Sequence, residues 1–452
     1  MINQKRKIIF ILFLPCVLFS QTNDTLTLQR LLDEVNVNSV RANEKTPISF
    51  TNIDLELINE KNLGQDLPYI ISHTPSIVTT SDAGAGVGYT SLRIRGSDPT
   101  RINVTINGIP LNDSESQGVW WVNMPDFISS IENIQIQRGV GTSTNGSSAF
   151  GASINLKTIG IKKEPYFVTN NTIGSYSTLK NNLEFGTGIL NNSFVFDGRL
   201  SKINSDGYID RASSDLKSLF LQGAYFSDNS ALKGIVMSGN ERTYQAWNGV
   251  PFNFLDTNRT YNSYTYKNEV DDYTQDHYQL HYTRQIKNDN SFNFGLHYTH
   301  GEGYYEQEKL DERLSDYGLN DIYLGDTTIT HTDLVRRKWL NNDFGGAIFS
   351  FNQKTNHLNL NIGGSINKYS GQHYGNIIWT EYASNSSVDF QYYWNKAEKF
   401  DRSTYAKANY FFNDQTNFYI DLQNRKNTYS FNGYDNNGNN AQQDNALDFY
   451  NP

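Results

Sequence analysis

The sequence predicts a membrane β-barrel that follows a small α+β domain. Three observations support this fold class. The chain is rich in aromatic residues, with 29 Tyr and 26 Phe, yet only 37% of it is hydrophobic. From about residue 166 onward, apolar and polar residues alternate with a period of two. The connections between these runs are alternately tight and long. This is typical of membrane strands that are connected by short turns on one side of the membrane and by long loops on the other.

The first twenty residues have the layout of a cleaved secretory signal peptide. Basic residues at 5–7 precede an apolar run at 8–19, and the small residue Ser20 follows. The apolar run is too short to span a bilayer as a helix. Its removal also removes Cys16, the single cysteine. The mature chain is therefore expected to fold without disulfides.

The charge balance argues against a nucleic-acid partner. The net charge is −9, and it becomes more negative when the three bases of the signal peptide leave. Proteins that bind nucleic acid carry basic surfaces that neutralise phosphates. No later apolar run is long enough for a membrane helix. The exported chain is expected to be periplasmic, secreted or an outer-membrane barrel.

Residues 42–158 are predicted to form the small mixed domain. Apolar side chains have helical spacing in residues 54–77, and Asn107-Gly108 is a strong hairpin signal. Strand-like runs lie at 91–96, 102–111 and 131–139. The Gly-rich stretches at 84–96 and 137–156 lack the residues that would make them nucleotide-binding loops. They are predicted to be tight backbone turns.

Eleven strands are predicted from about residue 166 to the end. Tight connections are expected at 191, 227–230, 287–290, 353–356 and 413–416. Longer connections are expected at 204–215, 245–272, 304–340 and 370–401, with a short exception near 175–178. A soluble β-sandwich or propeller would give the same alternation within strands. It would not explain why long and short connections fall on opposite sides.

Such a sheet must close when it lies in lipid, because each unpaired edge amide there costs several kcal/mol. The eleventh strand is followed by a polar, Asn-rich stretch that ends at "ALDFYNP" and supplies no closing strand. We therefore expect the sequence to be a fragment. A barrel of roughly twenty-two antiparallel strands is expected, with about the first eleven present.

Residues 33–158 resemble the amino-terminal segment and plug domain of TonB-dependent outer-membrane receptors. "DEVNVNSVR" (33–41) resembles their TonB box, and "LRIRGSD", "INGIPLND" and "IENIQIQRGVGTSTNGSSAFGASINLKT" resemble the plug motifs in the expected order. The sequence departs from the family at "GASINL", where two glycines are more usual, and at Asn36, where the box is usually more apolar.

The resemblance implies an organisation and a location. It places a signal peptide at 1–20, a periplasmic leader with the TonB box at 21–41, the plug at 42–158 and part of the transmembrane barrel at 159–452. The plug would fill the barrel lumen, and the outward strand faces would contact lipid of the outer membrane of a Gram-negative bacterium. No catalytic motif is present, so an enzyme is not expected.

The resemblance also implies an energy-transducing partner. "EVNVNSV" is extended and β-branched, so it can add as a strand to an exposed sheet edge of a periplasmic TonB-type protein. An ordinary disordered leader is the alternative. The residues expected to contact this partner are Asp33, Glu34, Val35, Asn36, Val37, Asn38 and Ser39.

A ligand pocket is expected where the plug apex meets the outer loops. Residues 81–91 and 112–123 supply Tyr89, Trp120 and Trp121 for stacking on a flat ligand, and Gln117 for a hydrogen bond. Alternatively, the tryptophans pack the plug against the barrel wall. Arg93 is a candidate for an anionic chelate. Weaker candidates in the barrel region are Tyr304, Tyr305, Trp247 and Trp379, because interfacial girdles use the same residue types.

Three further residues are expected to be structural elements of the plug. Arg95 is expected to be a buried partner of carboxylates on the barrel wall, and Arg138 and Gly139 belong to the plug motif that begins with the strand at 131–139. His277, His281, His297 and His300 lie near one another on the predicted strands, but no metal site and no cofactor are expected from them.

Two classes of function fit these features. The first is an active transporter that binds a ferric siderophore or related iron chelate, with cobalamin, haem or an oligosaccharide as alternative cargo. The second is a soluble β-rich binding or adhesion protein without transport. The resemblance favours the first class.

Overall fold

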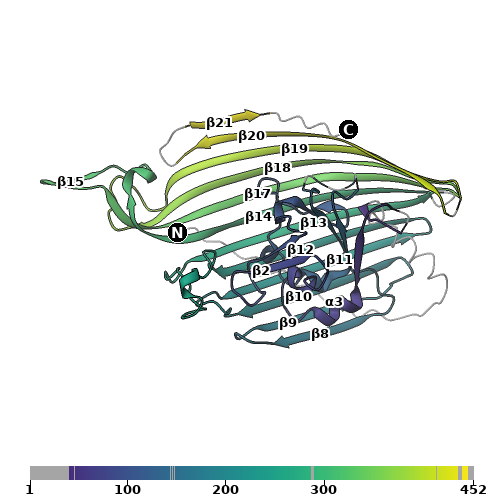
Figure 1. Cartoon of the computed structure of the whole chain (residues 1–452), viewed down its shortest axis with the longest axis horizontal. Coiled ribbons are helices and arrows are strands. Elements are labelled where there is room, and N and C mark those ends of the chain that lie inside the picture. Colours follow the sequence, from purple (N-terminus) through teal and green to yellow (C-terminus); the bar gives the residue numbers. More distant parts are fainter. Residues whose placement is uncertain are drawn as a thin grey trace.

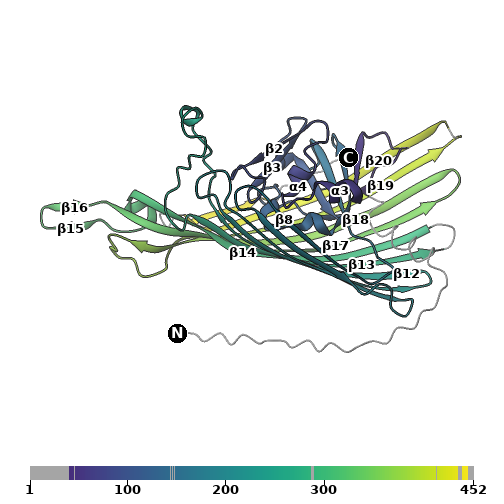
Figure 2. The same cartoon turned by 90° about the horizontal axis from the view of Figure 1, so that it is seen from below.

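A computed structural model describes residues 40–44, 46–142, 144, 146, 148–286, 290–413, 415–435 and 440–445. These residues form a small α+β domain that lies against the concave face of a large curved antiparallel sheet (Figures 1 and 2). Among the described residues, no helix is long and apolar enough to cross a membrane. The predicted signal peptide and residues 33–39 of the predicted TonB box lie outside the described residues.

The small domain, hereafter the inner domain, is built on a five-stranded sheet in the order β1-β6-β7-β4-β5. The parallel pairing of β4 with β7 is the exception to its antiparallel order. Its strands are β1 (Phe50–Asp54), β4 (Ile102–Ile106), β5 (Ile109–Pro110), β6 (Ile131–Arg138) and β7 (Ala152–Thr158). A separate hairpin joins β2 (Ile77–Ser81) to β3 (Thr90–Ile94). The helices are α3 (Leu55–Lys61), α4 (Leu67–Ile70) and the 3-10 turns η1 (Pro99–Arg101), η2 (Trp121–Asn123) and η3 (Phe127–Ser130).

Local sequence explains several of these elements. Asp54 caps α3 by accepting a hydrogen bond from the Leu57 amide. Asn107 and Gly108 both have positive φ, of 53° and 83°, and they form the predicted turn between β4 and β5. The core of the domain is dominated by isoleucines from β1, β4, β6 and β7. The predicted hairpin is confirmed.

The large sheet contains the eleven expected strands and a short twelfth, all antiparallel neighbours (Figure 1). They are β8 (Tyr166–Ile173), β9 (Leu179–Gly186), β10 (Phe194–Ser205), β11 (Ser214–Ser227), β12 (Ser230–Tyr244), β13 (Val270–Ile286), β14 (Asn290–Arg313), β17 (His331–Lys354), β18 (Leu358–Thr380), β19 (Phe390–Phe411), β20 (Asn417–Tyr434) and β21 (Asn440–Asn445). Between strands lie η4 (Phe252–Phe254), η5 (Leu314–Tyr317) and a small hairpin of β15 (Ile322–Leu324) and β16 (Thr327–Ile329).

The outward face of this sheet has the apolar character that lipid requires. On β14, Phe292, Leu296 and Tyr298 are exposed on one face, whereas Asn293 and His297 are buried on the other. The outward face also carries aromatic rings at matching register positions of three neighbouring strands, which is typical of an interfacial girdle. These rings are Tyr304, Trp339 and Tyr374.

Two of the long connections are shorter than the sequence predicts. The connection expected at 370–401 spans only the residues between Thr380 and Phe390, and β14 and β17 extend well into the one expected at 304–340. The backbone ladder continues here, with Leu334 opposite Thr380. Above the lipid, neither face of a strand needs to be apolar. The alternation of apolar and polar residues therefore stops there, although the strand itself continues.

Candidate functional site

A cavity of about 530 Å³ lies between the inner domain and the large sheet. The inner domain supplies the loop that follows β2 and the segment 110–124. The sheet supplies inward side chains of β12, β13, β14, β17 and β18. The described residues that line the cavity therefore come from distant parts of the sequence.

Three glycines allow the loop after β2 to reach the large sheet, hereafter the wall. Gly84, Gly86 and Gly88 have φ values of +74°, +75° and +90°, a region that favours glycine. A Cβ at Gly88 would lie 2.6 Å from the hydroxyl oxygen of Ser214 on β11. The loop is thus the tight turn that the sequence predicts, and its small residues let it press against the strands and present Tyr89.

Four aromatic rings form a row along the cavity, hereafter the aromatic row. Trp120 packs edge-on to Tyr89 at a centroid distance of 6.1 Å, Tyr89 to Trp247 at 5.5 Å, and Trp247 to Tyr305 at 5.5 Å. The first two rings come from the inner domain, and the last two come from the connection after β12 and from β14. The row joins the inner domain to the wall and gives the cavity a predominantly aromatic side.

The cavity lining is also acidic. Five carboxylates line the cavity, and the described lining residues include no Lys or Arg: the acids are Asp82, Asp113, Glu115, Glu241 and Asp271. The Tyr89 hydroxyl donates a hydrogen bond to Asp271 Oδ2. Burial, and then the charges of Glu241 and Asp271, raise the pKa of Tyr89 well above its usual value. The phenol therefore stays protonated and remains a donor.

Two of the acids are held by partners within the structure. Glu115 accepts hydrogen bonds from the hydroxyls of Tyr369 (2.7 Å) and Tyr429 (2.9 Å), and its Oε2 lies 3.3 Å from Nε2 of His373. Asp113 Oδ1 accepts from the amides of Glu115 and Ser116. These contacts tie the segment after β5 to β18 and β20. Burial raises the pKa of a third acid, Asp82, to about 6.

Other polar atoms at the cavity have no hydrogen-bond partner among the described residues. They are both carboxylate oxygens of Glu241, Nε2 of His277 and the indole nitrogen of Trp247. Glu241 is fully buried, and His277 is nearly so. Since buried polar groups in native proteins are almost always satisfied, these atoms mark a place that a ligand or water completes.

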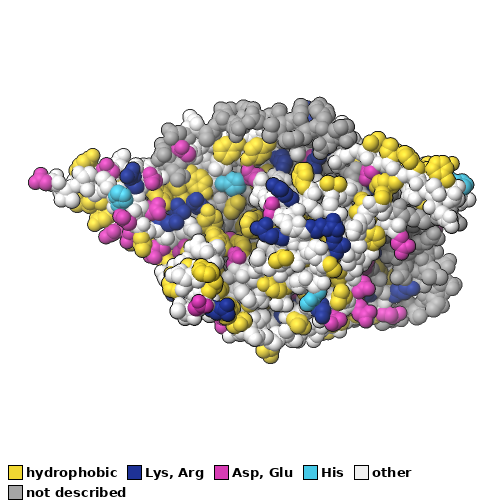
Figure 3. Space-filling model, viewed as in Figure 1, with side chains coloured by type: hydrophobic (Ala, Val, Ile, Leu, Met, Phe, Trp, Pro, Cys, Tyr) yellow, Lys and Arg dark blue, Asp and Glu magenta, His cyan; other side chains and the backbone are white. Residues whose placement is uncertain are grey.

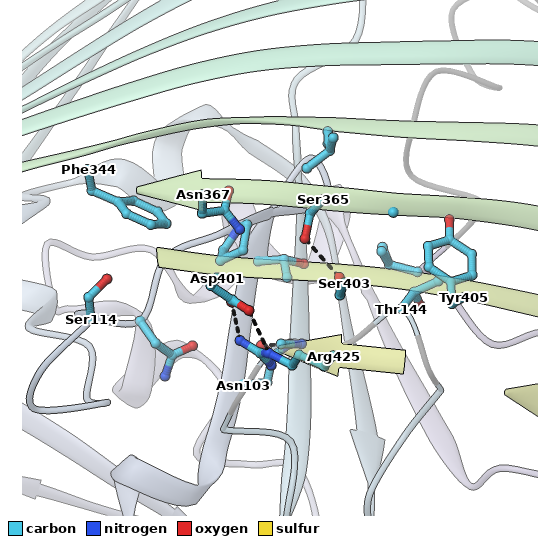
Figure 4. A pocket seen from close by; sticks show the side chains of 18 of the residues that line it. Asn103, Ser114, Thr144, Phe344, Ser365, Asn367, Asp401, Ser403, Tyr405 and Arg425 are labelled. Carbon is cyan, nitrogen blue, oxygen red and sulfur yellow. Dashed lines mark hydrogen bonds and ion pairs between the residues drawn. The ribbon is translucent and has the colours of Figure 1, made fainter. Parts of the chain in front are cut away.

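A second cavity, of about 80 Å³, lies between the inner domain and strands β17 to β20 (Figure 4). Asp401 on β19 and Arg425 on neighbouring β20 form an ion pair in its lining, and the hydroxyls of Ser365 and Ser403 lie 2.9 Å apart. Its volume holds only a few water molecules. We therefore assign the ligand to the larger cavity.

A buried ionic cluster, hereafter the Asp126 cluster, fastens the inner domain to the wall. The Asp126 carboxylate lies 2.7 Å from Lys180 Nζ and 3.3 Å from Arg199 Nη1, and all three side chains are buried. Ser201 and Asn182 also donate hydrogen bonds to Asp126 Oδ2. Burial alone would raise the pKa of Asp126, but Arg199 and Lys180 outweigh burial and lower it to about 2.

This cluster reverses the predicted charge arrangement. The sequence led us to expect that Arg95 on the inner domain is a buried partner of wall carboxylates, and that expectation is wrong for the described residues. Arg95 is exposed, has a φ of +50° and makes no ion pair with another described residue. It lies in the turn that follows Ile94, the last residue of β3, and not in the strand itself. In this structure the inner domain supplies the acid and the wall supplies the bases.

Two predicted ligand residues, Tyr89 and Trp120, line the large cavity. Trp121 does not, because it is only 6% exposed and packs in the core of the inner domain. Adjacent residues at this point face opposite ways, so one tryptophan meets the cavity and the next stabilises the domain. The core that Trp121 joins also contains Phe220, Ile235 and Met237 of the large sheet, which agrees with the alternative prediction of packing against the barrel wall.

The other two predicted ligand residues also lie outside the cavity lining. The Gln117 side-chain amide donates to the Ser114 carbonyl (2.7 Å), which turns it back onto its own loop. Arg93 is exposed on β3, where its neighbours Leu92 and Ile94 occupy the buried face. Basic side chains gather near the middle of the view in Figure 3, where the inner domain lies.

Arg138 and Gly139 lie at the end of β6. Arg138 donates to the Thr51 hydroxyl (3.0 Å) and, at 3.4 Å, to the Pro75 carbonyl. Gly139 has a φ of +100° and its amide donates to the Gly151 carbonyl. These contacts join β1, β6 and the turn before β7.

Sequence reasoning missed Glu241, Asp271 and the Asp126 cluster. Their signal in the sequence is weak. Alternation along a strand shows which residues point inward, but it does not show which strands approach the inner domain. Trp247 and Tyr305 were named as weaker candidates, and both line the cavity.

An inner domain held against a curved antiparallel sheet with an apolar outward face defines a plugged outer-membrane barrel. Residues 42–153 match the family model of the TonB-dependent receptor plug domain. Together, the plug match and the shared fold show that this chain carries a TonB-dependent receptor plug domain and resembles TonB-dependent receptors of the outer membrane.

Individual relatives agree with this class. The vitamin B12 transporter BtuB of Vibrio vulnificus is 28% identical over 190 residues, which are 42% of this chain and 29% of BtuB. The ferric yersiniabactin uptake receptor FyuA from Yersinia pestis has a TM-score of 0.65 at 10% identity, over 88% of this chain and 60% of FyuA. The ferripyoverdine receptor of Pseudomonas aeruginosa has a TM-score of 0.65 at 11% identity, over 89% of this chain and 54% of that receptor.

At these identities the solved structures show a shared fold alone. The chain spans less than a third of the length of the curated relative that it matches and little more than half of the two solved receptors.

Proposed function

We propose that the protein is an active importer that binds a small iron chelate, of the ferric siderophore class, in the large cavity and delivers it to the periplasm. The observation that carries this proposal is the aromatic cavity between inner domain and wall, where atoms of Glu241, His277 and Trp247 have no hydrogen-bond partner among the described residues. Its volume of about 530 Å³ lies in the range of small-molecule sites. Two receptors that share the fold are named for ferric yersiniabactin and ferripyoverdine.

A vitamin B12-type ligand is the second candidate. The curated relative with detectable sequence identity is a vitamin B12 transporter. The same aromatic row would serve a flat corrinoid ring as well as an aromatic chelate. Growth under separate limitation for iron and for cobalamin distinguishes the two cargoes.

In this proposal, energy arrives through residues 33–39, which add as a strand to a periplasmic TonB-type protein. The segment that follows them is fastened to the central strands of the inner domain. The side-chain amide of Gln135 on β6 exchanges two hydrogen bonds with the backbone of Ala42, at 2.8 and 2.9 Å, and Arg41 donates to the Asn155 carbonyl on β7. A pull on the leader would therefore reach β6 and β7 directly and loosen the inner domain from the wall.

The proposed division into leader (21–41), plug (42–158) and barrel (159–452) agrees with this path, because the pulled segment precedes the plug.

Deletion of residues 33–39 tests the importer. We expect growth on the iron chelate to be abolished while binding of the chelate to isolated outer membranes is retained. Loss of binding together with uptake would refute the proposed role of this segment. Growth of the deletion strain at the rate of the parent would refute energised import by this route.

A further inference from the structure

The chemistry of the large cavity narrows the kind of ligand that it admits, an inference that rests on the proposed function. The titratable groups among its described lining residues, tyrosines aside, are five carboxylates and two histidines. Two basic side chains lie close to the lining without being part of it. Lys338 Nζ is 6.0 Å from the centre of the Tyr305 ring, and Lys399 Nζ donates to the Ser114 carbonyl. A polyanionic chelate would meet five acidic side chains and no Lys or Arg among these lining residues.

Glu241 is the most deeply buried of the five acids. Its side chain points inward from β12 and is fully buried, and neither carboxylate oxygen has a hydrogen-bond partner among the described residues. A buried carboxylate without a partner is far less stable than a paired one. An arriving cation would remove that penalty, so the site is built to favour one.

The surroundings of Glu241 suit an organic cation. Tyr89, which lies close enough for the charge of Glu241 to act on its hydroxyl, is the second ring of the aromatic row. Aromatic faces beside a carboxylate attract ammonium and guanidinium groups. A bare metal ion fits less well, because the described residues contain no cluster of three or more His, Cys, Asp or Glu side chains arranged to hold one.

We propose that Glu241, supported by Asp271 and the aromatic row, is a subsite for a cationic group of the imported ligand. The receptor then takes a chelate that bears a protonated amine or guanidinium and discriminates against polyanionic chelates.

Three forms of one ferric chelate test the proposal. Ferrioxamine B carries a free ammonium group, its N-acetyl form is neutral at that position, and its N-succinyl form is anionic. Binding to the receptor purified from outer membranes is followed by quenching of tryptophan fluorescence, since Trp120 and Trp247 line the cavity. We expect the ammonium form to bind at least about tenfold more tightly than the succinyl form, because the anion would be buried beside Glu241.

The matched variants are Glu241→Gln and Glu302→Gln. Glu302 is exposed on the outward face of β14. Its neighbour Gly303 lies opposite Tyr273, and Tyr273 in turn lies opposite Glu241. We expect Glu241→Gln to reduce the preference to within about twofold and Glu302→Gln to leave it unchanged. Heat-modifiable gel migration checks that both variants are folded.

The proposal is overturned if the succinyl form binds as tightly as the ammonium form, if none of the three forms binds, or if the preference survives Glu241→Gln. Iron-limited growth of the parent strain reports separately on import. If the receptor supports such growth but shows no charge preference, the proposed function stands and the proposed subsite is refuted.

Discussion

Asp126 is the residue on which the seating of the inner domain depends most visibly. Its carboxylate meets two wall cations and two wall hydrogen-bond donors while fully buried. Removing one member of a buried pair leaves the others uncompensated, at a cost of about 3–5 kcal/mol. The backbone at Asp126 is left-handed, with a φ of +51°, so asparagine is the substitution that best preserves its conformation.

We therefore predict that Asp126→Asn lowers the guanidinium midpoint for release of the inner domain, measured by its susceptibility to protease. Glu60→Gln is the matched control, because Glu60 pairs with Lys61 on the exposed surface of the same domain, where an ion pair contributes at most about 1 kcal/mol. An unchanged midpoint for Asp126→Asn would mean that the cluster does not hold the domain.

The same residue predicts a pH dependence. The pKa of Asp126 in the folded state is about 2, below the usual value of about 3.9 for an unfolded aspartate. The stabilisation is therefore fully present above pH ~4 and is lost as the pH falls towards 2. The difference between the parent and Asp126→Asn is expected to shrink over that window. A difference that stays constant from pH 5 to pH 2 would contradict the assignment.

At the scale of elements, the loop between β2 and β3 decides whether the cavity exists. Gly88 combines a φ of +90° with a position where a Cβ would lie only 2.6 Å from the Ser214 hydroxyl. Any side chain there must push the loop, and Tyr89 with it, away from β11.

We predict that Gly88→Val weakens chelate binding by at least about tenfold through displacement of the loop. Gly96→Val is the control, since Gly96 has a φ of +80° but nothing within 4 Å of the point that its Cβ would occupy. It introduces similar backbone strain without the collision. Equal effects of the two substitutions, by tryptophan quenching, would show that strain rather than contact with the wall is responsible.

Most elements were predictable because their physics is local. Asn107-Gly108 fixes a hairpin through its own φ preferences, and the strands follow from alternation that lipid and water impose on opposite faces. Connection lengths were overestimated at 304–340 and 370–401, because alternation stops where lipid ends while backbone pairing continues. No local signal marks that part of a strand.

The site was only partly predictable for a different reason. Tyr89 and Trp120 lie close in sequence to the plug motifs. Glu241 and Asp271 come from strands more than a hundred residues away, and they become a site only because the inner domain approaches β12 and β13. Trp120 and Trp121 were equivalent in the sequence, and the packing of η2 separates them.

At the scale of the whole molecule, the outward face of the sheet must be in contact with lipid. Leu280 on β13 is exposed and lies opposite exposed Leu296 on β14. We predict that Leu280→Arg destabilises the folded barrel by about 2–4 kcal/mol, as expected for a charge near the bilayer midplane. Leu310→Arg is the control, because exposed Leu310 lies near the far end of β14, beyond the girdle residue Tyr304.

The measurement is the fraction of heat-modifiable receptor in the outer membrane. Equal fractions for Leu280→Arg and the parent would contradict the placement of this face in lipid.

The position of the iron in a bound chelate decides whether the large cavity is the ligand site. Crystals of the receptor with a ferric chelate that supports its iron-limited growth would give an anomalous difference map at the iron absorption edge. We expect an iron peak in the cavity bordered by Tyr89, Trp120, Trp247 and Glu241. An iron peak elsewhere on the receptor, or none, would contradict the assignment of this cavity as the ligand site.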